Sequence, residues 1–498
     1  MKPINRLRQS ETRAATGSGE KSELGEYGVL INGQWLKTAD AIEIHSPYDD
    51  ALVAVVYRAG PKEIEQAIAA AADAYRLTRK LPSWKRAEVL TKVSQGIAAR
   101  REEFARILAL EAGKPIRTAR LEVDRAVFTF QVASEETKRI HGEIIALDWL
   151  PGNEGRVGQV HRVPLGPVVG ISPFNFPLNL VAHKVAPALA AGNPIIIRPA
   201  SATPVSALKL GELILEAGWP EAGFAVVPSS TTDAAPLVED ARIKLLTFTG
   251  SPAVGWGLKS RAGFKRVTLE LGGNAGVIVH DDADLKYAAA RVAWGGFSYA
   301  GQSCISVQRV FISTNIYEEF VDHLIPRVKA QILGDPLDEK TDVGPMIDLG
   351  AAERLESWVK EATAGGAEVL IGSGRKGTLF EPTVLTSLKE EMSISCQEAF
   401  GPIVGLYPYT DIHQAIQAVD RSDFGLQAGL FTNNLKIIQE AFGGIEVGGL
   451  MVNDVPTFRI DHMPYGGVKQ SGFGREGLRY AIEEMTEMKL ITFNNREQ

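Results

Sequence analysis

Cysteine is scarce in this sequence, with only Cys304 and Cys396 among 498 residues. Two cysteines cannot form the disulfide framework of a small secreted scaffold, and such scarcity is typical of proteins from a reducing compartment. We therefore expect a cytoplasmic location. A chain of this length also exceeds the size of a single hydrophobic core, so two or three domains are expected.

Three further absences exclude other classes of protein. The net charge is −7 with both signs interspersed, whereas nucleic-acid binders concentrate basic residues on one face. The eight histidines never fall at metal-ligand spacing. The longest uncharged stretch, residues 163–182, is interrupted by prolines, which excludes a transmembrane helix. We expect no nucleic-acid partner, no membrane segment and no metal site.

The repeating pattern of the chain predicts its fold class. Residues 61–143 carry apolar residues at the three- and four-residue spacing of helices. Five short apolar runs then alternate with helical stretches, namely GPVVGIS, PIIIRP, GFAVVPS, KLLTFTGS and KRVTLELGG. Strands separated by helices predict an α/β domain with a parallel sheet that is covered on both faces. A second alternating block after residue 304 predicts a second α/β domain.

The ends of the five predicted strands indicate a ligand site. Parallel sheets bind ligands beyond the carboxyl ends of their strands, and these runs end in small or polar residues. We therefore expect a dinucleotide at this edge. The segment GFGREG (472–477) matches the glycine spacing of a dinucleotide-binding turn, but too little chain follows it to build a βαβ unit. We interpret it as an ordinary turn.

Two segments carry the residues for covalent chemistry at a carbonyl group. LELGGN contains Glu270, a carboxylate that can act as a base, followed by a Gly-Gly bend that lets backbone approach a ligand. GQSC contains Cys304, a nucleophile in its thiolate form. Each residue alone has a structural alternative, in which Cys304 is a small buried hydrophobe and Glu270 a solvated charge. Cys396 has no such neighbours and is interpreted as structural.

Several segments together carry a family resemblance. They are PFNFPL (173–178), GNPIIIRPAS (192–201), FTGS (248–251), LELGGN (269–274), GQSC (301–304), EAFGP (398–402) and PYGGVKQSGFGREG (464–477). In order and spacing they resemble the motif set of the NAD(P)-dependent aldehyde dehydrogenase superfamily. The stretch FRIDHMPYGG is most similar to the branch of lactaldehyde, nonphosphorylating glyceraldehyde-3-phosphate and phosphonoacetaldehyde dehydrogenases.

The resemblance implies a Rossmann-like cofactor domain, an α/β catalytic domain and a small β oligomerisation element. The chain is accordingly divided into a disordered tail without a signal peptide (1–24), a dinucleotide-binding domain (25–142 and 163–272), a catalytic domain (273–478) and the oligomerisation element (143–162 and 479–498). Strand-like runs in the last element, such as MKLITFN, leave an edge that invites pairing with another subunit. We expect a homodimer or homotetramer.

For catalysis, the resemblance implies that the Cys304 thiolate attacks an aldehyde and that hydride passes to NAD(P). The Asn175 side chain and the Cys304 backbone N–H would bind the oxyanion, and Glu270 would activate the water that hydrolyses the thioester. Lys184 matches a family lysine near the active site, with a role in proton transfer. The sequence around Lys184 is almost equally compatible with a lysine on a helix surface.

The resemblance also implies contacts with NAD or NADP. The residues concerned are Ser172, Pro173, Phe174, Arg198, Ala200, Ser201, Phe248, Gly250, Ser251, Gly255, Leu271, Gly272, Glu398 and Phe400. The family usually has lysine and often glutamate where this chain has Arg198 and Ser201. A glutamate would repel a 2′-phosphate, whereas serine leaves space and arginine offers a bidentate grip. We expect use of both cofactors. The alternative is that Ser201 caps the helix that starts near Thr203.

The substrate pocket is also predicted from the resemblance. Its expected residues are Arg125, Phe176, His183, Ser303, Arg459 and Tyr465. Relatives that use phosphorylated substrates tend to have arginine just before the catalytic cysteine, where this chain has Ser303. We therefore expect a short polar aldehyde, such as lactaldehyde, or a small anionic semialdehyde.

Two other functions are disfavoured. A CoA-acylating dehydrogenase typically lacks the glutamate found here as Glu270. A catalytically silent binding protein on the same fold would not need Cys304, Glu270 and Asn175 together.

Overall fold

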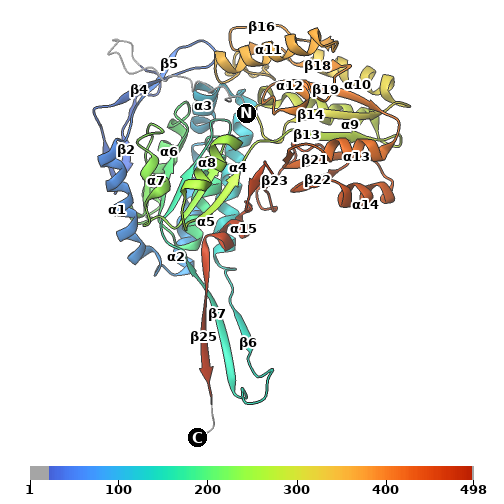
Figure 1. Ribbon diagram of the computed structural model, residues 1–498. Coiled ribbons are helices and arrows are strands. Elements are labelled where there is room, and N and C mark those ends of the chain that lie inside the picture. The colour runs from blue at the N-terminus through green and yellow to red at the C-terminus, as the bar shows by residue number, and fades with distance from the viewer. Residues whose placement is uncertain (1–21, 496–498) are drawn as a thin grey trace.

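The computed structural model describes residues 22–495. Of the expected disordered tail (1–24), residues 1–21 lie outside the described residues. The described chain is paired from its start, since the backbone N–H groups of Glu23 and Leu24 donate to Leu52 and Val53. Figure 1 shows two lobes, each containing a sheet and helices, and a three-stranded arm that projects from the first lobe.

The first lobe is built on a sheet with the strand order β24-β12-β11-β8-β9-β10-β2-β3. These strands are β2 (Val29–Ile31), β3 (Gln34–Leu36), β8 (Val168–Ile171), β9 (Ile195–Arg198), β10 (Phe224–Val226), β11 (Leu245–Thr249), β12 (Arg266–Glu270) and β24 (Gly472–Phe473). Strands β8 to β12 pair in parallel throughout, which confirms the predicted Rossmann-like sheet. The antiparallel edge strands β2, β3 and β24 were not predicted.

Helices cover both faces of this sheet. They are α1 (Pro61–Thr78), α2 (Ser83–Ala99), α3 (Arg101–Ala112), α4 (Ile116–Thr137), α5 (Asn179–Ala191), α6 (Val205–Glu216), the 3-10 turn η1 (Glu221–Gly223), α7 (Ala235–Glu239), α8 (Pro252–Arg261) and α15 (Leu478–Glu484). Along β9, Ile195 and Ile197 belong to one apolar cluster and Ile196 to the other, as the alternation of a strand requires. Burial on both faces explains the unbroken apolar runs of the sequence.

Strand order reverses next to β8. Strands β9 and β10 continue on one side of β8, while β11 and β12 lie on its other side. In such sheets the crevice beyond the carboxyl ends at the reversal point is where ligands bind. The segments after β8 and β11 therefore border the expected ligand site. A separate small sheet, β1-β5-β4, consists of β1 (Glu26–Tyr27), β4 (Ala41–His45) and β5 (Leu52–Tyr57).

The second lobe has a sheet with the order β15-β18-β19-β14-β13-β21-β22. Its strands are β13 (Ala275–Val279), β14 (Val307–Ser313), β15 (Glu368–Ile371), β18 (Thr383–Thr386), β19 (Ile403–Tyr409), β21 (Gln427–Phe431) and β22 (Gly449–Val452). Its helices are α9 (Leu285–Phe297), η2 (Ser298–Gly301), α10 (Tyr317–Lys329), α11 (Leu349–Ala364), α12 (Ser393–Cys396), α13 (Ile412–Asp420) and α14 (Leu435–Gly444). The predicted second α/β unit is present.

Side-chain caps fix the start of several of these helices. The side chains of Asp284, Asp348, Asp411 and Asn434 accept from the first-turn amides of α9, α11, α13 and α14, as short polar residues do at helix starts. Two short ribbons complete the lobe. They are β16 (Arg375–Lys376) with β17 (Leu379–Phe380), and β20 (Phe424–Gly425) with β23 (Val468–Lys469).

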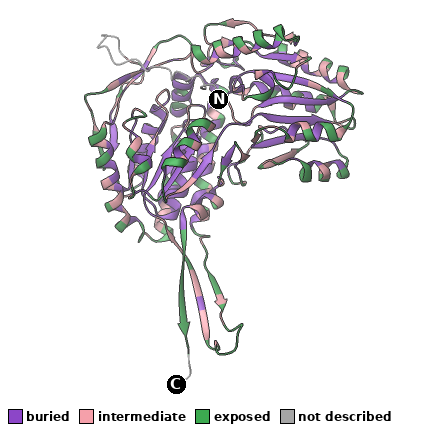
Figure 2. Ribbon diagram, viewed as in Figure 1, coloured by how far each residue is buried: buried purple, intermediate pink, exposed green. Residues whose placement is uncertain are grey.

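The arm contains β6 (Glu143–Ala146), β7 (Arg156–Pro164) and β25 (Thr486–Asn494), in the order β25-β7-β6. Figure 2 shows β25 exposed along its length, in contrast to the buried strands of the lobes. The arm nevertheless carries large apolar side chains. Trp149 is 86% exposed, Ile144 78% and Met488 62%. These side chains remain exposed to solvent in the single chain.

Two boundaries differ from the expected division of the chain. Strand β24, expected in the catalytic domain, pairs with β12 in the sheet of the first lobe. Helix α15, expected in the oligomerisation element from residue 479 onward, places Leu478 and Ile482 in the core of the same lobe. The apolar face of α15 packs against α4 and α5, which explains why it lies in the lobe rather than in the arm. Between residues 22 and 495, no helix is long and apolar enough to cross a membrane.

Candidate active site

Cys304 lies in the loop between η2 and β14. The residues before it have left-handed backbone angles, with φ of 51° at both Tyr299 and Ala300 and 64° at Gly301. Residues with side chains adopt this region rarely and at a cost. A Cβ atom at Gly301 would overlap the carbonyl oxygen of Gly401, so glycine is required there. The loop is strained and tightly packed, which fixes the position of the sulfur atom.

The thiol of Cys304 has one polar side-chain contact among the described residues. Its Sγ lies 3.2 Å from the hydroxyl oxygen of Tyr465. Burial raises the pKa of the thiol to about 12, while the hydrogen bond with Tyr465 and the charge of Arg459 act to lower it. The resting thiol is therefore protonated at neutral pH, and a thiolate requires stabilisation by its neighbours.

Asn175 follows β8 and reaches the nucleophile loop. Its side-chain Nδ2 donates to the carbonyl oxygen of Gln302 at 3.0 Å, and its Oδ1 accepts from the backbone N–H of Phe176 at 3.2 Å. An amide nitrogen has two hydrogens, so one N–H remains for a ligand. The geometry thus brings Asn175 beside the Cys304 loop, as the sequence predicts.

Glu270 is the last residue of β12 and is 2% exposed. Neither of its carboxylate oxygens has a hydrogen-bond partner in residues 22–495. Burial and the nearby charge of Glu476 raise its pKa well above the usual value, while Arg459 and Lys184 oppose that rise. A buried, unpaired carboxylate with a raised pKa has the properties of a general base.

The Gly-Gly bend after Glu270 packs between two site residues. A Cβ at Gly272 would overlap the carboxylate of Glu398, and one at Gly273 would overlap the backbone carbonyl of Cys304. The N–H of Gly273 donates to Glu398 at 2.8 Å. Glycine is therefore required at both positions, because the backbone of the base segment touches that of the nucleophile loop.

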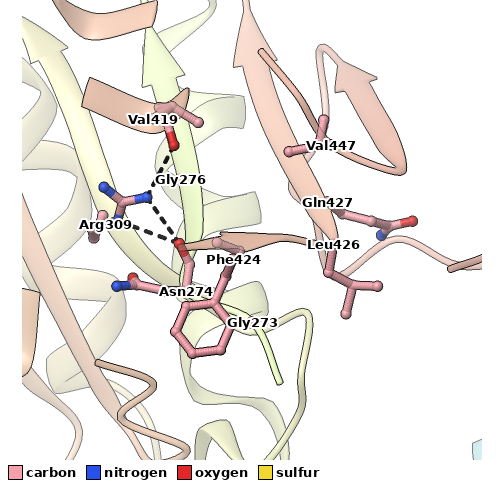
Figure 3. Close-up of a pocket in the computed structure, with 10 residues that line it drawn as sticks. Gly273, Asn274, Gly276, Arg309, Val419, Phe424, Leu426, Gln427 and Val447 are labelled. Atoms are coloured by element: carbon pink, nitrogen blue, oxygen red, sulfur yellow. Dashed lines mark hydrogen bonds between the residues drawn. The ribbon is translucent and has the colours of Figure 1, made fainter. Parts of the chain in front are cut away.

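Asn274, the next residue, anchors the bend to the second lobe. Figure 3 shows the guanidinium group of Arg309 directed at the carbonyl oxygen of Asn274, with N–O distances of 3.0 and 3.3 Å, and at that of Val419. The Asn274 side chain donates to the carbonyl of Ser395 at 2.8 Å. Arg309 is buried on β14. These hydrogen bonds connect the start of β13, which precedes Cys304 in the sequence, to β14, which follows it.

Lys184 is completely buried on α5. Its Nζ donates to the hydroxyl groups of Thr249 and Thr247, at 2.7 and 3.2 Å, and lies 3.4 Å from Glu476. Burial lowers the pKa of its ammonium group. The alternative of a helix-surface lysine is wrong, because α5 is buried on every side.

The predicted substrate residues form a charged network. Arg459 donates to Glu476 at 3.0 Å and lies 3.3 Å from the Nε2 of His183. His183 lies 2.8 Å from Asp461, which also binds Arg125 at 2.6 Å. The carboxylates of Asp461 and Glu476 are almost fully buried. Neither acidic residue was expected from the sequence, because each contacts its partners only through the tertiary fold.

The remaining pocket residues lie close by. Phe176 packs against Tyr299 with 6.1 Å between ring centres, and the guanidinium group of Arg125 lies 5.7 Å from the Phe176 ring. The Ser303 hydroxyl accepts from the N–H of Ile305 at 3.4 Å. The structure thus brings all six predicted pocket residues to the surroundings of the nucleophile loop and α5.

Known proteins resemble this chain along almost its whole length. Residues 35–491 match the model of the aldehyde dehydrogenase family. The 3-sulfolactaldehyde dehydrogenase of Priestia aryabhattai is 47% identical over 95% of this chain and 99% of its own length. The chain belongs to the aldehyde dehydrogenase family.

Other relatives and solved structures agree with this membership. Lactaldehyde dehydrogenase of Methanococcus maripaludis is 36% identical over 94% of this chain and 100% of its own. Aldehyde dehydrogenase 21 of Physcomitrella patens, solved with the reaction product succinate, is 44% identical, with a TM-score of 0.92 over 95% of this chain and 98% of its own. Glyceraldehyde-3-phosphate dehydrogenase of Methanocaldococcus jannaschii, solved with NADP, is 36% identical, with a TM-score of 0.88 over 91% and 99%.

In this aldehyde dehydrogenase, polar groups meet at the carboxyl ends of the central strands. Ser172, Arg198 and Ser229 follow or end β8, β9 and β10. The hydroxyl groups of Ser172 and Ser229 and the Nε of Arg198 are buried without hydrogen-bond partners in the described part of the chain. The other end of the Arg198 guanidinium donates to the carbonyl of Ser229 at 3.0 Å. Buried donors and acceptors without partners indicate a ligand that satisfies them.

Ser201 does not cap a helix. Helix α6 begins at Val205, and the buried carboxylate of Glu111 accepts from the N–H groups of Val205 and Ser206 at 2.8 and 3.1 Å. The predicted alternative, a cap by Ser201 near Thr203, is therefore wrong. Ser201 lies half-buried in the turn after β9, next to Ala200.

Further expected cofactor residues line the start of α8, which follows β11. Ser251 precedes the first helical residue. A Cβ at Gly250 would lie 2.6 Å from the Phe248 ring, and one at Gly255 would overlap Leu271. The helix thus approaches the sheet closely, with its first-turn N–H groups at the ligand edge, where such groups attract phosphate.

Glu398 and Phe400 also lie close to this edge, since Glu398 accepts from the N–H of Gly273 and Phe400 contacts Phe174. Burial raises the pKa of Glu398 to about 7. Phe400 has a left-handed φ of 47°, and its ring meets that of Phe174 edge to face at 5.8 Å. Pro173, between Ser172 and Phe174, continues the same loop.

Sequence reasoning missed a buried pair that holds the Asn175 loop. Lys114 donates to the carbonyl oxygen of Asn175 at 2.7 Å and also binds Glu122. Glu122 in turn accepts from the N–H groups of Leu178 and Asn179 at 3.0 and 3.1 Å. Both charged side chains are fully buried. Their contacts on either side of the loop fix the direction of the Asn175 amide.

Proposed function

We propose that this enzyme oxidises a short aldehyde carrying an anionic group, with NAD(P)+ as oxidant and Cys304 as nucleophile. The supporting observation is a buried guanidinium group beside the nucleophile. The central carbon of the Arg459 guanidinium lies 3.7 Å from the centre of the Tyr465 ring. The hydroxyl of the same ring lies 3.2 Å from the Cys304 sulfur.

Arg459 has an unsatisfied donor. Its side chain is 6% exposed, and Glu476 balances its charge through one nitrogen. Its Nε is buried and has no hydrogen-bond partner in residues 22–495. An unpaired N–H on a buried cation is costly, and an anionic oxygen of a substrate would satisfy it. Guanidinium groups bind carboxylates and sulfonates more strongly than neutral acceptors.

A second arginine extends the charged surface. Arg125 is 30% exposed and pairs with Asp461, which also binds His183. A long hydrocarbon chain placed against these groups would remove their hydration without replacing it. The site therefore favours a compact polar substrate.

Two relatives support an anionic substrate. Sulfolactaldehyde, named for the Priestia enzyme, carries a sulfonate group, and the Physcomitrella enzyme was solved with the dicarboxylate succinate. Lactaldehyde, named for the Methanococcus enzyme, is the neutral alternative. Ser303 in place of an arginine disfavours a phosphorylated substrate.

In the proposed mechanism, the Cys304 thiolate attacks the aldehyde carbon and forms a covalent thiohemiacetal. The free N–H of the Asn175 amide and the backbone N–H of Cys304 would stabilise the oxyanion. After oxidation to a thioester, Glu270 would remove a proton from an attacking water molecule and release the acid. The raised pKa of Glu270 matches this role, because a base is most effective when its pKa is near the working pH.

The residues at the strand ends fit NAD or NADP. The unpaired Ser172 hydroxyl and Arg198 Nε, with the start of α8, offer donors to phosphate and ribose oxygens. Glu398 and Phe400 would hold the nicotinamide end. When bound, NAD(P)+ accepts the hydride. Ser201 leaves room for a 2′-phosphate, and we propose that the enzyme uses both cofactors.

We also propose that the arm forms a homodimer or homotetramer. Its strands and the β6–β7 connection expose large apolar side chains, including Ile144, Trp149, Leu150, Met488, Leu490 and Ile491. Within residues 22–495, edge strand β25 is paired on one side only, which leaves its other edge available to a second copy.

The substrate proposal is tested with a small panel of aldehydes. We expect kcat/KM for 3-sulfolactaldehyde and succinic semialdehyde to exceed that for butanal, an uncharged chain of similar length, by roughly tenfold to a hundredfold. This range corresponds to a charged hydrogen bond of about 1.5–3 kcal/mol. The kcat/KM for lactaldehyde is expected to lie between the value for butanal and the values for the anionic aldehydes. Equal kcat/KM for butanal and the anionic aldehydes would contradict the proposal.

A matched pair of variants assigns the preference to one residue. Arg459→Met should remove most of the preference for anionic aldehydes, whereas general damage to the site would lower kcat/KM for all aldehydes equally. Arg421→Met is the control, because Arg421 pairs with Glu390 on the surface of the second lobe. An undiminished preference in Arg459→Met would exclude this arginine as the anion site.

A further inference from the structure

We propose that Tyr465 is a catalytic residue whose hydroxyl group donates a hydrogen bond to the Cys304 thiolate and stabilises the nucleophile before attack. The proposal rests on the proposed role of Cys304 as nucleophile. It gives Tyr465 a function at the reacting atom, beyond a place in the wall of the substrate pocket.

The contact between the two residues is built by the fold. The Tyr465 hydroxyl oxygen lies 3.2 Å from Sγ of Cys304. The ring is 3% exposed and packs with Ile305 and Leu426 in a small apolar cluster that Cys304 adjoins. The backbone of Tyr465 exchanges two hydrogen bonds with that of Glu476, at 3.1 and 2.6 Å. A buried ring on a paired backbone has little freedom, so the hydroxyl is held against the sulfur.

The charged groups around the Cys304 sulfur act in opposite directions on the thiolate, so a neutral hydrogen-bond donor adds needed stabilisation. Glu270 and Glu398 disfavour a thiolate at Cys304, and Arg459 favours it. Arg459 reaches the site across the face of the Tyr465 ring, with 3.7 Å to its centre. A cation over a phenol ring strengthens its O–H as a donor, because it stabilises negative charge on the ring oxygen. The charge of Arg459 therefore strengthens the hydrogen bond that Tyr465 donates to the sulfur.

Tyr465 keeps its own proton in this role. Burial raises the pKa of its phenol well above the usual value, so the hydroxyl stays protonated where the enzyme works. Ionisation of Cys304 releases the thiol proton to water or to the Glu270 carboxylate, and the Tyr465 O–H then donates to the sulfur anion. The opposite arrangement, in which the thiol donates to the tyrosine oxygen, would stabilise the uncharged thiol instead.

The two arrangements predict opposite effects of Tyr465→Phe on alkylation of Cys304. We would measure the rate of iodoacetamide labelling against pH in the absence of substrate and cofactor. The background variant is Cys396→Ser, because Cys396 is the other free cysteine and is exposed. We expect labelling at every pH below the midpoint to slow about tenfold, because loss of the donor raises the pKa of the thiol by about one pH unit. An unchanged profile, or faster labelling, would overturn the proposal.

Two further variants make the test specific. Tyr317→Phe is the control, since it removes a hydroxyl that contacts Thr386 in the second lobe at 2.6 Å, and its profile should match that of the parent. Replacing Tyr465 by a fluorotyrosine retains the ring and gives a stronger donor, so labelling below the midpoint should become faster. Unchanged or slower labelling would overturn the proposal even if Tyr465→Phe fails to fold. Labelling of Cys304 without loss of activity would refute the nucleophile itself, and that result is independent of the aldehyde.

Discussion

Replacing Ser201 by glutamate should lower kcat/KM for NADP much more than kcat/KM for NAD. Ser201 lies half-buried in the turn after β9, and no hydrogen bond of its side chain is found within residues 22–495. The amides at the start of α6 are satisfied by Glu111. The substitution therefore removes no helix cap, and its effect should come from the added charge. Arg198, three residues earlier, is held by the Ser229 carbonyl and keeps an unpaired Nε for a phosphate oxygen.

The magnitude follows from the charge that is added. A carboxylate about 6 Å from a phosphate charge, at an effective dielectric constant near 20, costs about 3 kcal/mol. Partial exposure of residue 201 to solvent reduces this figure, so we expect about 1–3 kcal/mol. A loss of this size corresponds to roughly fivefold to a hundredfold in kcat/KM for NADP relative to NAD.

The assay is a steady-state measurement of kcat/KM for both cofactors at a saturating aldehyde concentration. Ser201→Gln, which has a similar size without the charge, is the matched control and should change the ratio much less. Arg198→Lys should weaken NADP more mildly than Ser201→Glu, since the charge remains and only the fork geometry is lost. A ratio that stays within about twofold of the parent in Ser201→Glu would refute a 2′-phosphate site at this turn.

Three further predictions concern the catalytic groups and the arm. Glu270→Gln should give a burst of about one NAD(P)H per active site followed by slow turnover. The pH dependence that reports the raised Glu270 pKa should disappear from the slow phase. Loss of the burst would mean that Glu270 acts before hydride transfer. Asn175→Ala should lower kcat by roughly a hundredfold, as loss of one oxyanion donor does, and a loss under about threefold would mean that its free N–H points elsewhere. Removal of the residues after Met488 should yield monomers or aggregates by light scattering, because it deletes most of β25; a truncated enzyme of unchanged size would refute the role of the arm.

The parallel core of the first lobe could be predicted because its strands are unbroken apolar runs separated by helices. The edge strands β2, β3 and β24 have only two or three residues, too few to show an alternating pattern. Helix α15 was expected in the arm because it adjoins β25 in sequence, although its apolar face packs into the lobe. Short elements and their partners depend on tertiary contacts that local patterns do not contain.

In the site, the motifs predicted Cys304, Glu270 and Asn175, and the structure brings them together. The groups that hold them were missed. A signal existed for Glu122, which lies between Ala119 and Val123 on the buried face of α4. A carboxylate on an apolar helix face requires a buried partner, and Lys114 is that partner. The pairing of Arg459 with Glu476 had no comparable signal, because both residues lie in irregular segments.

In the proposed mechanism, oxidation of the aldehyde proceeds through a covalent bond to Cys304. The most direct measurement is mass spectrometry of Glu270→Gln after brief mixing with an aldehyde substrate and NAD(P)+, with Cys304→Ala in the same background as control. We predict an acyl adduct on the peptide that contains Cys304, no adduct in the control, and no turnover by Cys304→Ala in the otherwise unchanged enzyme. Turnover by Cys304→Ala within about tenfold of the parent rate, or an adduct confined to another residue, would contradict this mechanism.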